Sequence, residues 1–184
     1  MPEKKTMERA AKLKREGKSA STQAGEFVRE EIEHIREGKH GARSAKQAIA
    51  IGLSQARRAG VDLPPPEKGK TSEKTRRSAE SAWKQGQGKA PKRKRSAKRS
   101  KAIQHALERE GHSAGSHTAL SRQAHAAARR RTPEERSEAA QRAVKTKGPQ
   151  ERKDAARKAV RTKGHEGLAR AARKAARTRA AHAV

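Results

Sequence analysis

Thr132-Pro-Glu-Glu-Arg-Ser-Glu-Ala-Ala-Gln-Arg-Ala-Val-Lys-Thr-Lys-Gly148 opens a repeat that fills most of the C-terminal third of this 184-residue chain. The next sixteen residues repeat its order of acids, alanines and a closing Thr-Lys-Gly, and Pro133 recurs as Pro149. A third copy follows at the same spacing, and a looser copy occupies residues 117–129. Because this period is shorter than the usual solenoid repeats and is not a multiple of seven, it predicts an array of single short helices.

Each copy carries residues that begin and end a helix. Thr132 is suited to cap the N-terminus, with Pro133 at the first helical position and Glu135 completing a capping box. Gly148 stands where a left-handed residue ends a helix. Within residues 155–161 the alanines share one side of the helix and the basic residues the other. An alanine surface buries little area, at about 25 cal/mol per Å², so we predict that these helices do not pack firmly on one another.

The net charge is the strongest indication of function. The chain has 48 Lys and Arg against 20 Asp and Glu, a formal charge of +28, and its pI is near 11.5. Such a charge predicts a polyanionic partner such as DNA, RNA or anionic lipid. Leu, Ile, Val and Phe together make up about 9% of the residues, below the roughly 20% under which a highly charged chain is expected to be disordered. We therefore expect no single core across the chain and a largely disordered basic tail.

The charge is divided unequally along the sequence. Residues 1–66 hold 14 basic and 9 acidic residues, a net of +5, which leaves +23 for residues 67–184. We predict an all-α protein whose basic tail consists of short Ala/Arg/Lys-rich helices in 16-residue repeats. Its five expected parts are a basic N-terminal arm with a frayed helix (1–21), a helical hairpin (22–61), a Pro-rich linker (62–70), a basic, partly helical linker region (71–115) and the basic repeat tail (116–184).

The predicted hairpin is the one region with enough apolar side chains to pack. Its first helix, residues 22–37, gathers Phe27 and the isoleucines on one stripe. The second helix opens on a capping box of Ser44 and Gln47 and ends at Gly60 with a Schellman contact. Small residues such as Gly52 predict that the two helices approach closely. Because some forty residues are marginal alone, we expect the hairpin to dock on the preceding helix or to form a homodimer.

No catalytic, cofactor or metal site is predicted. Residues 69–71 end like a phosphate-binding loop, but Pro64 stands where the upstream glycine belongs. The histidines lie in linkers or beside arginines and are interpreted as surface residues rather than metal ligands. Glu30, Glu31 and Glu33 are interpreted as exposed acids with no apolar pocket to raise their pKa. The absence of cysteine excludes disulfides and thiol chemistry.

The basic side chains are the candidate site, because Lys and Arg neutralise phosphates without reading sequence. Aromatic residues make up 1% of the chain, which argues against stacking on unpaired bases and favours duplex DNA over single strands. With about eight phosphates engaged, the log–log salt slope would be near −7. The candidate phosphate contacts are Lys92, Arg93, Lys94, Arg95, Lys98, Arg99, Lys101, Arg129, Arg130, Arg131, Arg142, Lys145, Lys147, Arg157, Lys158, Arg161, Lys163, Arg173, Lys174, Arg177 and Arg179.

Base recognition by the hairpin is a weaker hypothesis. Residues 38–41 offer a turn between two helices, and Lys46 and Gln47 would then lie where a recognition helix contacts bases. We favour the simpler interpretation, in which Lys46 is a surface residue and Gln47 a capping residue. Trp83 is interpreted as the anchor of a small apolar cluster rather than as a stacking group.

Two resemblances support a bacterial DNA-binding protein. Residues 67–184 resemble in composition the tails of linker histones and of bacterial histone-like, nucleoid-associated proteins, although this tail has an explicit period and more arginine. The segments Glu26-Phe-Val-Arg-Glu-Glu31 and Ser44-Ala-Lys-Gln-Ala-Ile-Ala-Ile-Gly-Leu-Ser54 resemble a small bacterial helical domain of uncharacterised function, in which Lys-Gln-Ala-Ile-Ala-Ile is the recurring motif. These resemblances imply a cytoplasmic, nucleoid-associated protein and no catalytic residues.

The resulting hypothesis is non-sequence-specific binding of duplex DNA, with compaction or protection of the nucleoid. One alternative is an RNA-binding or ribosome-binding protein that uses the same cations. Another is an adaptor whose hairpin docks a protein partner while the tail localises it. Membrane binding is disfavoured, because the basic helices lack the large apolar side chains that enter a headgroup region and no apolar run is long enough to span a bilayer.

Overall fold

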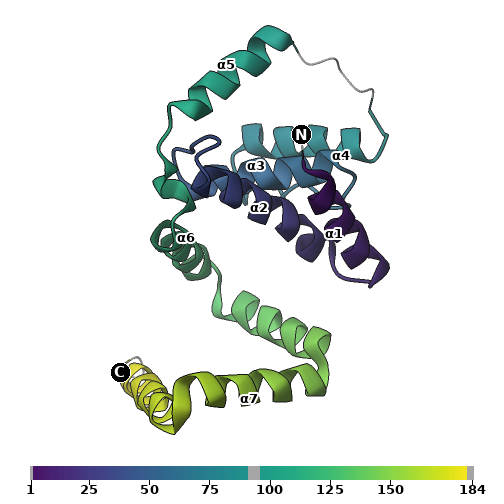
Figure 1. The fold of residues 1–184 in the computed structure, drawn as a ribbon. Coiled ribbons are helices and arrows are strands. Elements are labelled where there is room, and N and C mark those ends of the chain that lie inside the picture. Colours follow the sequence, from purple (N-terminus) through teal and green to yellow (C-terminus); the bar gives the residue numbers. More distant parts are fainter. Residues whose placement is uncertain (1, 91–95, 182–184) are drawn as a thin grey trace. The chain divides into compact units, whose positions relative to one another are not determined.

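The computed structural model describes residues 2–90 and 96–181, and within these ranges the chain is helical with no β-strand (Figure 1). The all-α prediction is therefore confirmed. The chain divides into two units, residues 1–126 and 127–184. The elements are α1 (Lys4–Arg15), α2 (Ala20–Arg36), α3 (Ala45–Arg58), α4 (Glu73–Gly86), α5 (Ala97–Glu108), the 3₁₀ turn η1 (His112–Gly115), α6 (His117–Arg129) and α7 (Pro133–Ala181).

The core of the first unit is the predicted hairpin of α2 and α3. Phe27 and Ile35 of α2 are almost fully buried. A Cβ built on Gly52 of α3 would lie 2.6 Å from the Cα of Val28, so the two helices cross at a distance that only glycine allows. The predicted close approach of the hairpin helices is confirmed. The first helix begins earlier than the expected residue 22, because the Ser19 side chain caps it.

The helix caps predicted at the two ends of α3 are present in the structure. The Ser44 hydroxyl accepts a hydrogen bond from the Gln47 backbone N–H at 3.2 Å. The Gln47 amide oxygen accepts a hydrogen bond at 3.0 Å from the backbone N–H of Arg43, one residue before the N–H used in a standard capping box. At the other end of α3, Gly60 is left-handed with φ +91°, and the Val61 N–H donates to a carbonyl in the last turn at 3.1 Å. This is the expected Schellman ending.

Helix α1 packs against α2, contrary to the frayed arm that we expected. Thr6 and Ala10 are buried, and the Arg9 guanidinium lies 3.8 Å from the Glu26 carboxylate of α2. The expectation failed because α1 has few large apolar groups, whereas its small residues allow a close contact with α2. We expected the hairpin either to dock on the preceding helix or to form a homodimer. In the structure the preceding helix is docked on it.

Helix α4 packs on α3, so the Pro-rich segment is not a stiff break between independent parts. Ala79 and Ala82 of α4 are buried. The guanidinium of Arg57 in α3 donates to the carbonyls of Leu63 (3.1 Å) and Pro64 (3.3 Å), which ties the segment to the helix before it. The linker therefore folds back and places α4 against α3.

Trp83 of α4 also connects this helix to the Pro-rich segment. Its indole N–H donates to the Asp62 carboxylate at 2.9 Å, and the Lys89 ammonium lies 4.8 Å from the centre of its ring. These contacts hold Trp83 in place through an acidic and a basic side chain, whereas the sequence predicted that it anchors a small apolar cluster.

The segment from the end of α5 to η1 forms backbone hydrogen bonds with the loop between α2 and α3. The backbone N–H of Gly41 donates to the Leu107 carbonyl at 2.9 Å, and that of Ala42 donates to the Gly111 carbonyl at 3.1 Å. A Cβ on Gly41 would lie 1.9 Å from the Glu110 carbonyl oxygen, so glycine is required there. Part of the region expected to be a linker (71–115) thus belongs to the folded unit.

The second unit is helical, where we expected a largely disordered tail. Helix α7 runs from Pro133 to Ala181 and is interrupted by non-helical backbone at Gly148 and Gly164. In Figure 1 the ribbon of α7 changes direction at two points. No residue of α7 is buried. The tail is helical despite its few bulky apolar residues because Ala, Arg, Lys and Glu are strong helix formers without any core.

Candidate nucleic-acid interface

The repeat in the sequence is also a repeat in the structure. Gly148 and Gly164 divide α7 into three helical segments, residues 133–147, 149–163 and 165–181. The first segment begins with the predicted capping box. The Thr132 hydroxyl accepts from the Glu135 N–H at 3.2 Å, and the Glu135 carboxylate accepts from the Thr132 N–H at 3.1 Å.

A threonine near the end of each segment makes the same hydrogen bond. The hydroxyl of Thr146 donates to the carbonyl four residues earlier at 2.8 Å, and that of Thr178 does so at 3.0 Å. Thr162 in the middle segment makes the equivalent bond to the Lys158 carbonyl. The three segments therefore share local geometry as well as residue order.

The two joints between segments have one conformation. Gly148 has φ 66° and ψ 174°, and Gly164 has φ 65° and ψ 173°. This region of backbone space is open essentially only to glycine. Gly148 precedes Pro149, which also disfavours a helical conformation at the residue before it, whereas Gly164 precedes His165. Each joint therefore ends one basic helix and starts the next in a fixed local geometry.

The predicted phosphate contacts are exposed wherever the structure describes them. Lys92, Arg93, Lys94 and Arg95 lie outside the described residues. The three other cations of that cluster lie on α5, which the Ser96 hydroxyl caps. The exposed candidates are Lys98, Arg99, Lys101, Arg129, Arg130, Arg131, Arg142, Lys145, Lys147, Arg157, Lys158, Arg161, Lys163, Arg173, Lys174, Arg177 and Arg179.

The apolar side of the segments is uncovered as well. Val144 is 47% exposed and Val160 is 54% exposed, although both lie on the alanine stripe. The helices thus do not bury this stripe against one another, as the small area of an alanine surface predicts.

Acidic residues neutralise only part of the charge of the second unit. Residues 127–184 hold 18 basic and 6 acidic residues, a net of +12. Arg142 lies 3.6 Å from Glu138, and Arg157 lies 3.9 Å from Asp154, and all four side chains are exposed. Exposed ion pairs contribute roughly 0–1 kcal/mol, so these acids do not prevent the arginines from turning to a phosphate.

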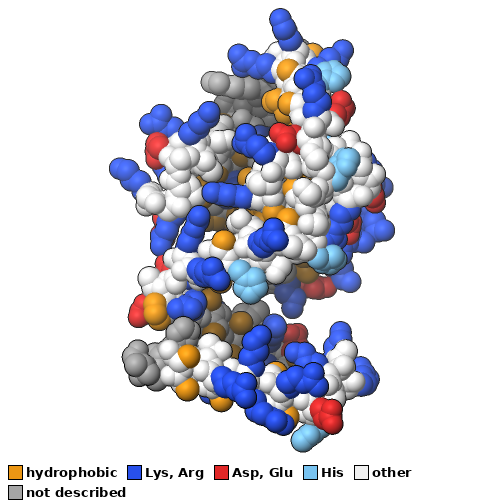
Figure 2. Space-filling model, turned by 90° about the vertical axis from the view of Figure 1, so that its left-hand side faces the viewer, with side chains coloured by type: hydrophobic (Ala, Val, Ile, Leu, Met, Phe, Trp, Pro, Cys, Tyr) orange, Lys and Arg blue, Asp and Glu red, His pale blue; other side chains and the backbone are white. Residues whose placement is uncertain are grey.

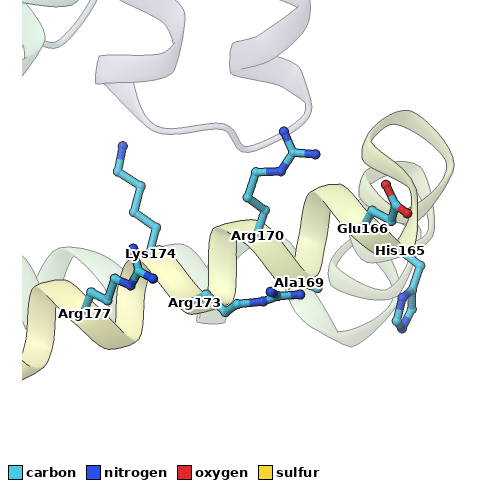
Figure 3. Close-up of a pocket in the computed structure, with 7 residues that line it drawn as sticks. All are labelled: His165, Glu166, Ala169, Arg170, Arg173, Lys174 and Arg177. Carbon is cyan, nitrogen blue, oxygen red and sulfur yellow. The ribbon is translucent and has the colours of Figure 1, made fainter.

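The third segment illustrates the chemistry of this surface. In Figure 3 Arg170 and Lys174 extend to the same side of the helix, while Arg173 and Arg177 lie along it. With four cations and one acid, this surface favours an anionic ligand, and it offers little apolar contact. The open hollow on this segment is lined by His165, Glu166, Ala169, Arg170, Arg173, Lys174 and Arg177.

Basic side chains are exposed along the described length of the second unit rather than gathered at one point. Figure 2 shows Lys and Arg across the visible face of the molecule, with Asp and Glu at scattered positions. Such a distribution suits an extended polyanion better than a small anionic ligand.

The hairpin gives little support to base recognition. The Gln47 side chain accepts a hydrogen bond from the Arg43 N–H, so its amide oxygen is engaged in capping α3. Lys46 is exposed. The interpretation of Gln47 as a capping residue is confirmed.

A group of buried polar residues in the first unit was not predicted from the sequence. Glu30 is 5% exposed and Glu31 is 1% exposed, contrary to the exposed position predicted for them, whereas Glu33 is exposed as predicted. Burial raises the pKa of Glu31, although the nearby His40 opposes the shift. The sequence signal was a Glu-x-x-His spacing from Glu31 to His34, which places both side chains on one face of a helix.

Within the described part of the chain, no helix has the length and apolar character needed to cross a membrane. Comparison with curated proteins gives no match, and comparison with solved structures gives none either. Residues 12–68, which include α2, α3 and most of the Pro-rich segment, match the model of a family of unknown function (DUF6496).

Proposed function

We propose that this protein binds duplex DNA without sequence specificity, through Lys and Arg contacts to phosphates, and thereby compacts or protects a bacterial nucleoid. The observation that carries the proposal is the series of exposed basic helices in α7, repeated every sixteen residues and covered by no other element of the second unit. Affinity then comes from release of counterions and not from contacts to base edges.

The dimensions of a segment suit a duplex. Residues 149–163 would form a helix about 22 Å long at about 1.5 Å per residue. A duplex carries one negative charge per about 1.7 Å of its axis, so the six cations of this segment face more phosphates than they can neutralise. The joints at Gly148 and Gly164 keep α7 from being one straight rod, which allows successive segments to follow a curved phosphate backbone.

The aromatic residues favour a duplex over unpaired strands. The chain holds 1 Phe, 1 Trp and no Tyr. Phe27 is buried in the hairpin, and Trp83 is engaged by Asp62 and Lys89. Neither ring is free to serve as the platform on which single-strand binders stack bases.

Competition between nucleic acids tests the choice of partner. The full chain is bound to a fluorescent duplex DNA and displaced by unlabelled duplex DNA of unrelated sequence, by single-stranded DNA and by a structured RNA at the same salt concentration. We expect unrelated duplexes to compete equally and single-stranded DNA to compete less well. Displacement by the RNA at concentrations well below those of the duplex would instead favour the RNA-binding function.

A further inference from the structure

Two buried carboxylates, Glu30 and Glu31, and two partly buried imidazoles, His34 and His40, lie close together in the first unit. Potential ligand atoms of Glu31, His34 and His40 all lie within 4.8 Å of one another. The Nε2 atom of His40 lies 3.6 Å from Oε1 of Glu31. Glu30 and Glu3 adjoin the group through His34, whose Nε2 lies 3.9 Å and 3.0 Å from their carboxylates.

The Glu31 carboxylate is held on one oxygen and unpartnered on the other. Its Oε2 accepts from the Gln55 side chain at 2.9 Å. Its Oε1 is buried without a hydrogen-bond partner within the described residues, and so is Oε2 of Glu30. Buried carboxylate oxygens are normally hydrogen-bonded, paired or bound to a metal. The free oxygen of Glu31 is the one nearest His40.

His40 is oriented as a metal ligand would be. Its Nδ1 lies 3.1 Å from the Gly41 carbonyl oxygen. In the tautomer with the proton on Nδ1, it donates to that carbonyl and leaves the Nε2 lone pair facing Glu31. Metal-ligating histidines usually donate their other ring N–H to a carbonyl or carboxylate. The Gly41 position is itself secured by its hydrogen bond to the Leu107 carbonyl.

We propose that Glu31, His34 and His40 bind a divalent transition-metal ion of the zinc type. Zinc bonds of about 2.0–2.2 Å to nitrogen and oxygen place tetrahedral ligand atoms about 3.3 Å apart. The 3.6 Å separation of His40 and Glu31 is close to this value, and binding would draw the His34 ligand atom, which lies within 4.8 Å of both, closer to them. A water molecule would complete the tetrahedron.

The donor set selects the class of ion. Two imidazoles and a carboxylate suit zinc and its transition-metal neighbours, whereas Mg²⁺ and Ca²⁺ prefer oxygen ligands alone. The side chains of His34 and His40 are each 19% exposed, which leaves a path from solvent to the ligand atoms. Because the ligands come from α2 and from the loop before α3, the ion would lock the hairpin loop onto α2.

Calorimetric titration of the full chain with ZnCl₂, without DNA, tests the site. We expect one ion per chain, with affinity reduced at least tenfold in both His40→Gln and Glu31→Gln. The matched control is His165→Gln, which removes a histidine of the second unit and should leave this site unchanged. MgCl₂ should give no saturable binding.

Thermal unfolding gives a second readout. Zinc should raise the melting temperature of the wild type and of His165→Gln, and should not raise that of either ligand variant. Circular dichroism of the metal-free variants establishes that they are folded. The proposal is overturned if the wild type shows no saturable zinc site, or if Glu31→Gln, whose side chain keeps the size of glutamate, binds zinc like the wild type.

Discussion

Gly148 and Gly164 lie sixteen residues apart and share one backbone conformation, with φ 66° and 65° and ψ 174° and 173°. Each ends a helical segment whose last turns carry the same threonine hydrogen bond. The geometry of α7 is therefore set by the repeated sequence within each copy. Contacts between copies contribute little, since no residue of α7 is buried.

Replacing the second joint should merge two segments. In Gly164→Ala the present conformation would cost about 1–3 kcal/mol, and no proline follows, so the helix should continue through residue 164. We expect higher helix content by circular dichroism and a longer distance between spin labels placed at residues 150 and 178. Ser137→Ala is the control, because it improves helix propensity within the exposed first segment and leaves the joint in place. An unchanged distance in Gly164→Ala would show that the joint does not depend on glycine.

The close crossing of α2 and α3 predicts opposite effects for two glycines. Gly52→Ala places a Cβ 2.6 Å from the Val28 Cα and should destabilise the first unit by about 1–3 kcal/mol. Gly25→Ala adds a Cβ to α2 with nothing within 4 Å and should stabilise the unit by about 0.5–1 kcal/mol. Urea unfolding followed by Trp83 fluorescence measures both. Equal effects of the two substitutions would contradict the crossing.

Replacing the buried Glu31 should change the stability of the first unit in opposite directions with and without bound zinc. Without metal, Glu31→Gln removes a buried charge with an unpartnered oxygen and keeps an acceptor for Gln55, so it should stabilise the first unit by about 1–2 kcal/mol. With excess zinc the order should reverse, because the variant loses the stabilisation that a bound ligand confers on the folded state. Unfolding with and without a chelator measures the two cases. The zinc dependence would be refuted if the variant were the more stable protein in both.

The ion pairs at the start of α4 predict that the Glu73 carboxylate titrates at an unusually low pH. Hydrogen bonding from Arg76, with Arg77, lowers the pKa of Glu73 to about 2 from 4.5. Because the folded-state pKa is depressed, the stability due to Glu73 is present above pH 4.5 and is lost as pH falls towards 2. This contribution should be small, since the carboxylate is exposed. NMR titration of the carboxylate should show the low midpoint in the wild type and a higher one in Arg76→Gln; the same midpoint in both would exclude Arg76 as the main cause.

Features encoded by neighbouring residues were predictable from the sequence. The capping boxes at Thr132 and Ser44 and the helix end at Gly60 formed as expected. Each depends on a few residues of one loop, whose preferences are strong enough to act without tertiary context.

Features that depend on distant segments were not predictable in the same way. The packing of α1 and α4 uses Ala10, Ala79 and Ala82, which a search for bulky apolar stripes overlooks. The buried carboxylates have partners that a local pattern does not indicate: the Glu3 N–H donates to Glu30, and the Gln55 side chain of α3 donates to Glu31. The exposure of the basic residues was predictable because it requires only the absence of a covering surface.

Neutralising cations of α7 should weaken DNA binding more than neutralising cations of the first unit. Lys158→Gln with Arg161→Gln should lower affinity equally for unrelated duplexes and make the log–log salt slope less steep by about 2. The matched control is Lys14→Gln with Lys46→Gln, which removes the same charge from exposed positions of the first unit. A larger loss of affinity in the control pair would place the interface on the first unit instead.

The most direct test of the central proposal is a salt titration of DNA binding by the full chain, repeated with duplexes of unrelated sequence. If phosphate contacts from about eight cations provide the affinity, the logarithm of the binding constant should fall linearly with the logarithm of potassium chloride concentration, with a slope near −7 for every duplex. A slope near zero, or an affinity that depends strongly on the duplex sequence, would contradict it.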